Sequence, residues 1–215
     1  LAVMFLDIDH FKRINDSLGH DAGDALLKVI ANHIKGSVRS HEDVVARFGG
    51  DEFCILISLR DRDEARNMAQ RIMAKMKEPV ELAGRRMVMT TSIGISLFPE
   101  DGSTCEELLK HADLALYQSK GAGRNGLHFF SASLKNRATL ELQLEEELRH
   151  ALREENGLTL YYQPIFELKT GRVTKLEALI RWEHPARGLL TPDAFISIAE
   201  NNGLSADPDN WLLRR

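Results

Sequence analysis

The most constraining feature of the sequence is a Gly-Gly pair inside residues 47–53, which read Arg-Phe-Gly-Gly-Asp-Glu-Phe. The pair separates two β-rich runs and predicts a hairpin, because a tight turn between strands needs the conformational freedom of glycine. Asp51 and Glu52 follow the turn and offer oxygen ligands for a divalent cation. Gly49 and Gly50 would let a phosphate approach the backbone closely. The competing interpretation is an acidic turn that is only solvated.

A second acidic cluster lies upstream, at the end of an apolar run. Residues 1–8 are apolar apart from Asp7, which is typical of a strand that is buried on both faces. An aspartate at the end of such a strand is costly unless it is paired or bound to a metal. If this strand lies beside the hairpin, Asp7 converges with Asp51 and Glu52. Carboxylates from two strands beside a lysine suit a magnesium-triphosphate site for nucleotidyl transfer.

Composition restricts the class of protein and its partners. The 215 residues suggest one domain or a domain and a fraction, and the net charge of -4 argues against a broad nucleic-acid-binding face. Cys54 and Cys105 lack the spacing of a zinc site or a disulfide framework, which favours a reducing compartment. No apolar stretch reaches the roughly 20 residues of a membrane span. We expect a cytoplasmic piece of a longer protein, with any membrane attachment made by regions outside this sequence.

The apolar periodicity alternates between strand and helix. Strand patterns occupy residues 1–8, 43–48, 53–58, 80–82, 87–97 and 127–130. Helical patterns occupy residues 11–18, 21–34, 61–77 and 103–119. Ser103 and Glu106 have the spacing of a capping box, and Gly94 marks a bulge or a close approach. This order predicts an α/β (α+β) domain with a central, mainly antiparallel sheet flanked by helices.

The character of the sequence changes after residue 131. We expect a first domain at residues 1–131, a helical linker at 132–156 and the opening of a second α/β domain at 157–215. The linker is amphipathic, and its three glutamates at positions 145–147 are expected to be a solvated face. Strand patterns follow at 158–168 and 173–182, and Thr191-Pro192 signals the start of a helix.

Four ordered blocks of the first domain resemble the GGDEF family of diguanylate cyclases. They are Asp-Ile-Asp-His-Phe-Lys-Arg-Ile-Asn-Asp from position 7, Gly-His-Asp-Ala-Gly-Asp from 19, the hairpin motif from 47, and Ala-Asp-Leu-Ala-Leu-Tyr-Gln-Ser-Lys-Gly-Ala-Gly-Arg-Asn from 112. The resemblance implies a palm-like nucleotide cyclase fold. It also implies condensation of two GTP into cyclic di-GMP, a bacterial second messenger, with release of pyrophosphate.

The resemblance assigns a role to each matching position. Asp7, Asp51 and the carbonyl of Ile8 would bind Mg²⁺ or Mn²⁺, and Glu52 would serve as a metal ligand or in proton handling. We expect a structural role for Asp9. The other matching positions would bind GTP: Asn15 and Asp24 the guanine, Lys12, Lys120 and Arg124 the phosphates, with Gly49 and Gly50 leaving space. Without the surrounding motifs, Asn15 and Asp24 would be interpreted as ordinary polar residues of a helix. Lys120 and Arg124 would be interpreted as cations at the C-terminal end of a helix.

The family comparison also bears on assembly and regulation. One domain holds one GTP, so ring closure requires a homodimer, for which Arg47 is a candidate contact. The alternative is a non-catalytic GTP-binding module that controls an attached phosphodiesterase.

The inhibitory Arg-x-x-Asp product site of the family has its aspartate at Asp43, but Ser40 replaces its arginine and Arg39 is one residue away. We therefore expect weak or absent feedback inhibition. The family's N-terminal helix and the segment that follows it are missing from the sequence.

The C-terminal part resembles the start of an EAL domain, a cyclic di-GMP phosphodiesterase built on a (β/α)8-type barrel. The matching runs are Tyr-Gln-Pro-Ile from position 162, Glu-Ala-Leu-Ile-Arg-Trp from 177 and Pro-Asp-Ala-Phe-Ile from 192. The resemblance makes Glu177 a metal ligand and Arg181 a contact to substrate phosphate. The run at residues 205–210 departs from the family pattern, and a metal-dependent hydrolase needs further carboxylates from later strands. We expect no phosphodiesterase activity from this piece alone.

Overall fold

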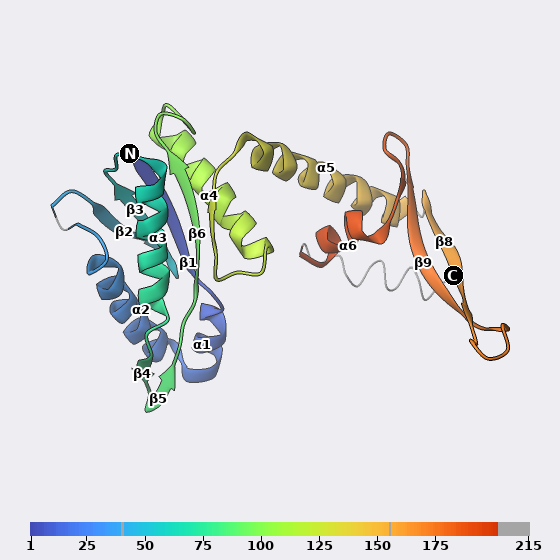
Figure 1. The fold of residues 1–215 in the computed structure, drawn as a ribbon, viewed down its shortest axis with the longest axis horizontal. Helices are drawn as coiled ribbons and strands as arrows, with labels where there is room; N and C mark the ends of the chain where they lie inside the picture. Colours follow the sequence, from blue (N-terminus) through green and yellow to red (C-terminus); the bar gives the residue numbers. More distant parts are fainter. Residues whose placement is uncertain (40, 155, 202–215) are drawn as a thin grey trace. The chain divides into compact units, whose positions relative to one another are not determined.

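The computed structural model describes residues 1–39, 41–154 and 156–201, with the backbone alone for residues 197, 200 and 201. The chain forms two compact units, Leu1–Asn136 and Arg137–Arg215 (Figure 1). No helix in the described parts of the chain combines the length and apolar character that crossing a membrane requires.

The first unit is built on a five-stranded sheet in the order β2-β3-β1-β6-β7 (Figure 1). The strands are β1 (Ala2–Ile8), β2 (Val44–Gly49), β3 (Glu52–Ile57), β6 (Thr91–Leu97) and β7 (Leu127–Phe129). All pairs are antiparallel except β6 with β7. The prediction of a mainly antiparallel sheet is therefore confirmed. All seven residues of β1 are buried, as its apolar run predicts.

Helices cover both faces of this sheet. Side chains alternate between the two faces along each strand, and the apolar side chains on both faces must be buried. The helices are α1 (Phe11–Leu18), α2 (His20–Lys35), α3 (Arg62–Met76) and α4 (Cys105–Gly121). Met4 and Leu6 of β1 belong to the core that contains Ile30 of α2 and Ile72 of α3. Val3 and Phe5, which point to the other face, pack with Leu108, Ala112 and Leu116 of α4.

Gly94 lets α4 approach the sheet closely. A Cβ atom at this position would lie 2.1 Å from the carbonyl oxygen of Ala112 and 2.1 Å from the amide nitrogen of Leu116. Of the two roles that the sequence suggests for Gly94, the close approach is correct. The end of α4, which carries Lys120, is thereby fixed against β1 and β6.

Two local predictions in this unit are wrong. Residues 87–97 do not form one strand: β4 (Val80–Leu82) pairs with β5 (Arg85–Met87) in a separate hairpin, whose turn has positive φ at Ala83 and Gly84. The capping box of α4 is formed by Thr104 and Glu107, one residue later than predicted. Both pairs have the same Ser/Thr-x-x-Glu spacing, so the pattern alone could not choose between them.

The second unit contains a three-stranded antiparallel sheet in the order β10-β9-β8. Its elements are β8 (Leu158–Phe166), β9 (Val173–His184), β10 (Gly188–Leu190) and α6 (Pro192–Asn201), together with most of α5 (Ala132–Glu154). Trp182 and Phe195 are buried with Leu148 of α5 in its core. The short strand β10 is not predicted from the sequence. The described residues form no closed barrel, as expected for the opening part of one.

Candidate active site

Strand pairing places two of the predicted site residues opposite each other. Asp7 of β1 is the register partner of Glu52 of β3, and such antiparallel partners have Cβ atoms about 5 Å apart. Asp51 lies in the turn beside Gly50, whose φ of 49° favours glycine. Position 7 thus lies next to the hairpin tip, as the sequence predicts.

The hairpin tip is held by an arginine from its own strand. The Nε and Nη2 atoms of Arg47 donate hydrogen bonds to the carbonyl oxygen of Gly50, at 3.0 and 2.7 Å. This two-pronged contact fixes the turn that carries Asp51. The guanidinium for which the sequence suggested a role in the dimer is therefore engaged within its own hairpin.

Asp7 is largely buried and lies near two other carboxylates and one ammonium group. Its side chain is 13% exposed, and its Oδ2 accepts a hydrogen bond from Nζ of Lys120 at 2.6 Å. Burial raises the pKa of Asp7, and the neighbouring carboxylates of Asp51 and Glu52 raise it further, whereas Lys120 opposes the increase. Among the described residues, Lys120 is the one cation that forms an ion pair with Asp7.

The chemistry of this donor set fits a divalent cation. Asp7 interacts with the carboxylates of Asp51 and Glu52 and is paired with one ammonium group, that of Lys120, and carboxylate oxygens are the ligands that Mg²⁺ and Mn²⁺ prefer. Within residues 1–39, 41–154 and 156–201, no three His, Cys, Asp or Glu side chains are already arranged around a common metal position. Binding would therefore require local side-chain rotation. Ile8, whose carbonyl is the predicted neutral ligand, ends β1 next to Asp7.

The side chain of Asp9 is buried and bound by hydrogen-bond donors of the protein. Its carboxylate accepts hydrogen bonds from Thr90 Oγ1 at 2.7 Å, Ser92 Oγ at 2.8 Å and the backbone N–H of Asn125 at 3.0 Å. The residue is 2% exposed, so these donors replace its hydration. Asp9 connects the end of β1 to β6 and to the loop after α4. The sequence predicted this structural role, but not the three partners.

The side-chain amide of Asn15 in α1 has an unused hydrogen-bond acceptor. Its Oδ1 is buried and makes no hydrogen bond with any described residue. Gly23 of α2 leaves the space for it, since a Cβ at position 23 would lie 1.9 Å from this oxygen. Buried polar atoms are nearly always satisfied. An orphaned amide oxygen here is therefore consistent with a ligand that supplies a donor.

Asp24 lies next to a cavity of about 380 Å³ between α2 and the hairpin. Both apolar and charged side chains line the cavity. Its lining residues are Asp24, Leu27, Lys28, Ala31, Lys35, Val45, Arg47 and Phe53. The exposed carboxylate of Asp24 can accept hydrogen bonds from a planar base that enters this space.

Substituting Gly23 with alanine tests the position of Asn15. The added methyl group would displace the Asn15 amide. If this amide binds the guanine, as the family resemblance implies, GTP should bind about tenfold more weakly, because the hydrogen bond between amide and base would be lost. The affinity should be measured by calorimetry with a non-hydrolysable GTP analogue, alongside the corresponding ATP analogue. We expect the preference for guanine to shrink, while the free energy of unfolding changes little because a side chain can move aside. Unchanged affinity for the guanine analogue would show that Asn15 does not read the base.

The remaining predicted cations are exposed. The side chains of Lys12 in α1 and Arg124 in the loop after α4 make no ion pair or hydrogen bond to the residues that the structure describes. Arg124 has a φ of 63° in this loop, whose neighbouring residue Asn125 binds Asp9. Both cations are available to an anionic ligand, whereas Lys120 is already bound to Asp7.

Asp43 is enclosed by protein donors. Its side chain is fully buried and accepts hydrogen bonds from the backbone N–H groups of Arg39 and Ser58, at 2.8 and 3.3 Å. The guanidinium of Arg39 adds contacts at 3.4 and 3.5 Å and also binds Glu64 of α3. These contacts fasten the loop before β2 to the end of β3. Ser40, which replaces the arginine of the product site, lies outside the described residues.

In the second unit, the two predicted residues of β9 differ in environment. Glu177 is exposed and is the register partner of Gln163. Arg181 donates a hydrogen bond to the carbonyl of Ile180 at 2.9 Å, and its guanidinium lies 5.7 Å from the ring centre of Tyr161. Neither residue belongs to a metal cluster in the described part of the chain. Residues 205–210, where the sequence departs from the EAL pattern, lie outside the described residues.

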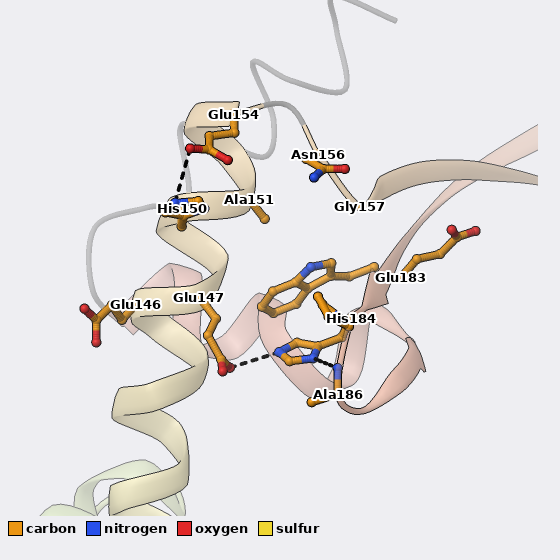
Figure 2. A pocket seen from close by; sticks show the side chains of 12 residues that line it. Glu146, Glu147, His150, Ala151, Glu154, Asn156, Gly157, Glu183, His184 and Ala186 are labelled. Atoms are coloured by element: carbon orange, nitrogen blue, oxygen red, sulfur yellow. Dashed lines mark hydrogen bonds and ion pairs between the residues drawn. The ribbon is translucent and has the colours of Figure 1, made fainter.

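A cavity of about 550 Å³ in this unit lies between α5 and the end of β9 (Figure 2). His184 lines it and is held firmly: Nε2 contacts Glu147 Oε2 at 2.9 Å, and Nδ1 accepts the backbone N–H groups of Ala186 and Arg187, at 3.1 and 3.2 Å. The hydrogen bond from His184 and the nearby Arg187 lower the pKa of Glu147. Glu147 is exposed, as predicted, but its contacts with His184 and Arg187 are not predicted from the sequence. The pairing depends on β9, and the spacing within α5 gives no sign of it.

Comparison with known proteins agrees with this architecture. The family described as "Diguanylate cyclase, GGDEF domain" matches residues 1–126, and the EAL domain family matches residues 145–215. A relative, "Cyclic di-GMP phosphodiesterase NbdA" of Pseudomonas aeruginosa, is 60% identical over the whole of this chain and 27% of its own length. "Bifunctional diguanylate cyclase/cyclic di-GMP phosphodiesterase MucR" of the same organism is 42% identical over 99% of this chain and 31% of its own length.

A solved structure supports the fold of the first unit. The GGDEF domain of YfiN from Pseudomonas aeruginosa has a TM-score of 0.62 and 40% identity, over 64% of this chain and 81% of that one. This chain spans about a third or less of the length of the two curated relatives. The chain belongs to the GGDEF family, and its GGDEF domain is followed by the N-terminal part of an EAL domain.

Proposed function

We propose that this chain carries a diguanylate cyclase domain that condenses two GTP molecules into cyclic di-GMP. The observation that carries the proposal is the cluster of Asp7 and Glu52, opposed across two strands, with Asp51 and the single ammonium of Lys120. A divalent cation held there would neutralise triphosphate charge and lower the pKa of the attacking hydroxyl. Mg²⁺ or Mn²⁺ is the expected cofactor.

Separate sets of residues would bind the cation, the guanine and the phosphates. Asp7, Asp51, Glu52 and the Ile8 carbonyl would hold the cation, while Asn15 and Asp24 would orient the guanine. Lys12, Lys120 and Arg124 bind the phosphates, and Gly49 and Gly50 allow them to approach the backbone. In each of two steps the 3′ hydroxyl of one nucleotide loses its proton to solvent, and its oxygen bonds to the α-phosphorus of the other. The bond from that phosphorus to the β-phosphate breaks, and one pyrophosphate leaves.

Both steps require two sites that face each other. Each GGDEF domain would hold one GTP, so two copies related by a two-fold axis would form the product. The direct test is to incubate the chain with GTP and Mg²⁺ and to measure cyclic di-GMP and pyrophosphate over a range of protein concentrations. We expect the rate per molecule to rise with protein concentration.

A second candidate function is supported by the EAL match and by the name of the relative NbdA. In this alternative, the GGDEF domain binds GTP without turnover and regulates an attached phosphodiesterase, in which Glu177 and Arg181 would bind metal and phosphate. GTP binding without any product, at all protein concentrations, would favour this alternative over the cyclase.

Feedback by the product should be weak in this chain. Both oxygens of Asp43 already accept hydrogen bonds from Arg39 and Ser58, so the carboxylate has little capacity left for a ligand. We expect micromolar cyclic di-GMP to leave the initial rate of pyrophosphate release unchanged. Asp43→Asn should instead lower the free energy of unfolding by about 2 kcal/mol, because a buried charged acceptor is lost. Inhibition by cyclic di-GMP that disappears in this variant would contradict the expectation.

A further inference from the structure

The ion pair between Lys120 and Asp7 links two positions that are 113 residues apart in sequence. The ammonium is 2.6 Å from Oδ2 of Asp7, and the two side chains are 30% and 13% exposed. Lys120 lies near the end of α4, a helix that Gly94 lets approach the sheet closely. The lysine is thus directed onto the carboxylate that the proposed cation would need.

The ammonium of Lys120 partly neutralises the negative charge around Asp7. Asp7 is desolvated, and Asp51 and Glu52 add negative charge around it. One ammonium offsets only part of that charge. A divalent cation that binds Asp7 must therefore compete with Lys120 for the same carboxylate, because placing both cations there adds repulsion between them.

We propose that Lys120 is a built-in competitor of the divalent cation at Asp7, and that the triphosphate relieves the competition by giving the lysine another partner. This inference rests on the proposed GTP site and adds its regulation. The cation alone binds weakly, because it must displace Lys120. Once phosphates hold Lys120, Asp7 is released, so that metal and nucleotide bind cooperatively. Because such coupling is reciprocal, the cation strengthens nucleotide binding by the same factor.

The test measures binding of Mn²⁺ to the full chain without nucleotide, by electron paramagnetic resonance. We expect Lys120→Met to increase the Mn²⁺ affinity about tenfold, within the range of typical coupling energies. A non-hydrolysable GTP analogue should strengthen Mn²⁺ binding to the unmodified chain but should have a much smaller effect on the variant. Circular dichroism would verify that the variant is folded.

Two further variants make the result specific. Lys110→Met removes a lysine from an exposed position of the same helix and should leave Mn²⁺ binding unchanged. Lys120→Arg keeps the charge and should keep the affinity low. Unchanged or weaker Mn²⁺ binding by Lys120→Met, or no binding by any variant, would overturn the inference.

These results are separate from those for the cyclase. The Mn²⁺ affinities are measured without turnover, so a chain that makes no cyclic di-GMP can still show the Lys120 effect. Conversely, the unmodified chain could synthesise cyclic di-GMP while Lys120→Met leaves the Mn²⁺ affinity unchanged. That result would support the proposed cyclase activity and reject the proposed competition between Lys120 and the cation.

Discussion

Replacing Asp51 with asparagine should lower the rate of cyclic di-GMP formation about a thousandfold. A bound metal ion stabilises the transition state of phosphoryl transfer by several kcal/mol, and each 1.36 kcal/mol corresponds to a factor of ten in rate. The neutral amide removes one charged ligand from the cluster at the hairpin tip. The fold should be unaffected, because Asp51 is a partly exposed turn residue. The rate should be measured by chromatography of the nucleotides.

Asp63→Asn is a matched control for this change. Asp63 is exposed in the first turn of α3 and lies outside the proposed site. It loses the same charge and should retain the full rate. If Asp51→Asn keeps more than a tenth of the activity, the proposed assignment of Asp51 to the metal is wrong, even if the domain proves to be a cyclase.

Gly94→Ala should destabilise the first unit by about 3 kcal/mol, a large effect for one added methyl group. The new Cβ would overlap backbone atoms of Ala112 and Leu116 at 2.1 Å, and the backbone of a packed helix cannot rotate away as a side chain can. Relief requires α4 to move off the sheet, which also removes Lys120 from Asp7. Urea unfolding followed by circular dichroism would measure the loss.

Gly121→Ala provides the comparison at the end of the same helix. Apart from the neighbouring residues and backbone of α4 itself, no described atom lies within 4 Å of a Cβ at this position, so the substitution should leave stability unchanged or slightly increase it. Equal stability for the two variants would contradict the close packing of α4 against β6.

Much of the first unit could be predicted from local patterns. The apolar run that ends at Asp7 identified β1, and the Gly-Gly pair identified the hairpin, so the neighbourhood of Asp7 and Glu52 followed from pairing those strands. The break between β5 and β6 was missed because Met87 to Leu97 is a continuous β-rich stretch. Its division depends on the pairing of β4 with β5, which periodicity does not encode.

The contacts that shape the candidate site were harder to predict because their partners are distant in sequence. Lys120 reaches Asp7 only because Gly94 lets α4 lie close to the sheet. Asp9 finds Thr90 and Asn125 through the same tertiary arrangement. Such pairings depend on packing across the sheet rather than on spacing along one element.

The contact from Arg47 to Gly50 has a consequence for the thermodynamics of ligand capture. Two consecutive glycines would otherwise sample many backbone conformations, and ordering each residue costs about 1–2 kcal/mol of conformational entropy. Because the guanidinium already restrains this segment, that cost is met during folding of the chain. A nucleotide then meets a preorganised surface, and more of its interaction energy is retained as affinity.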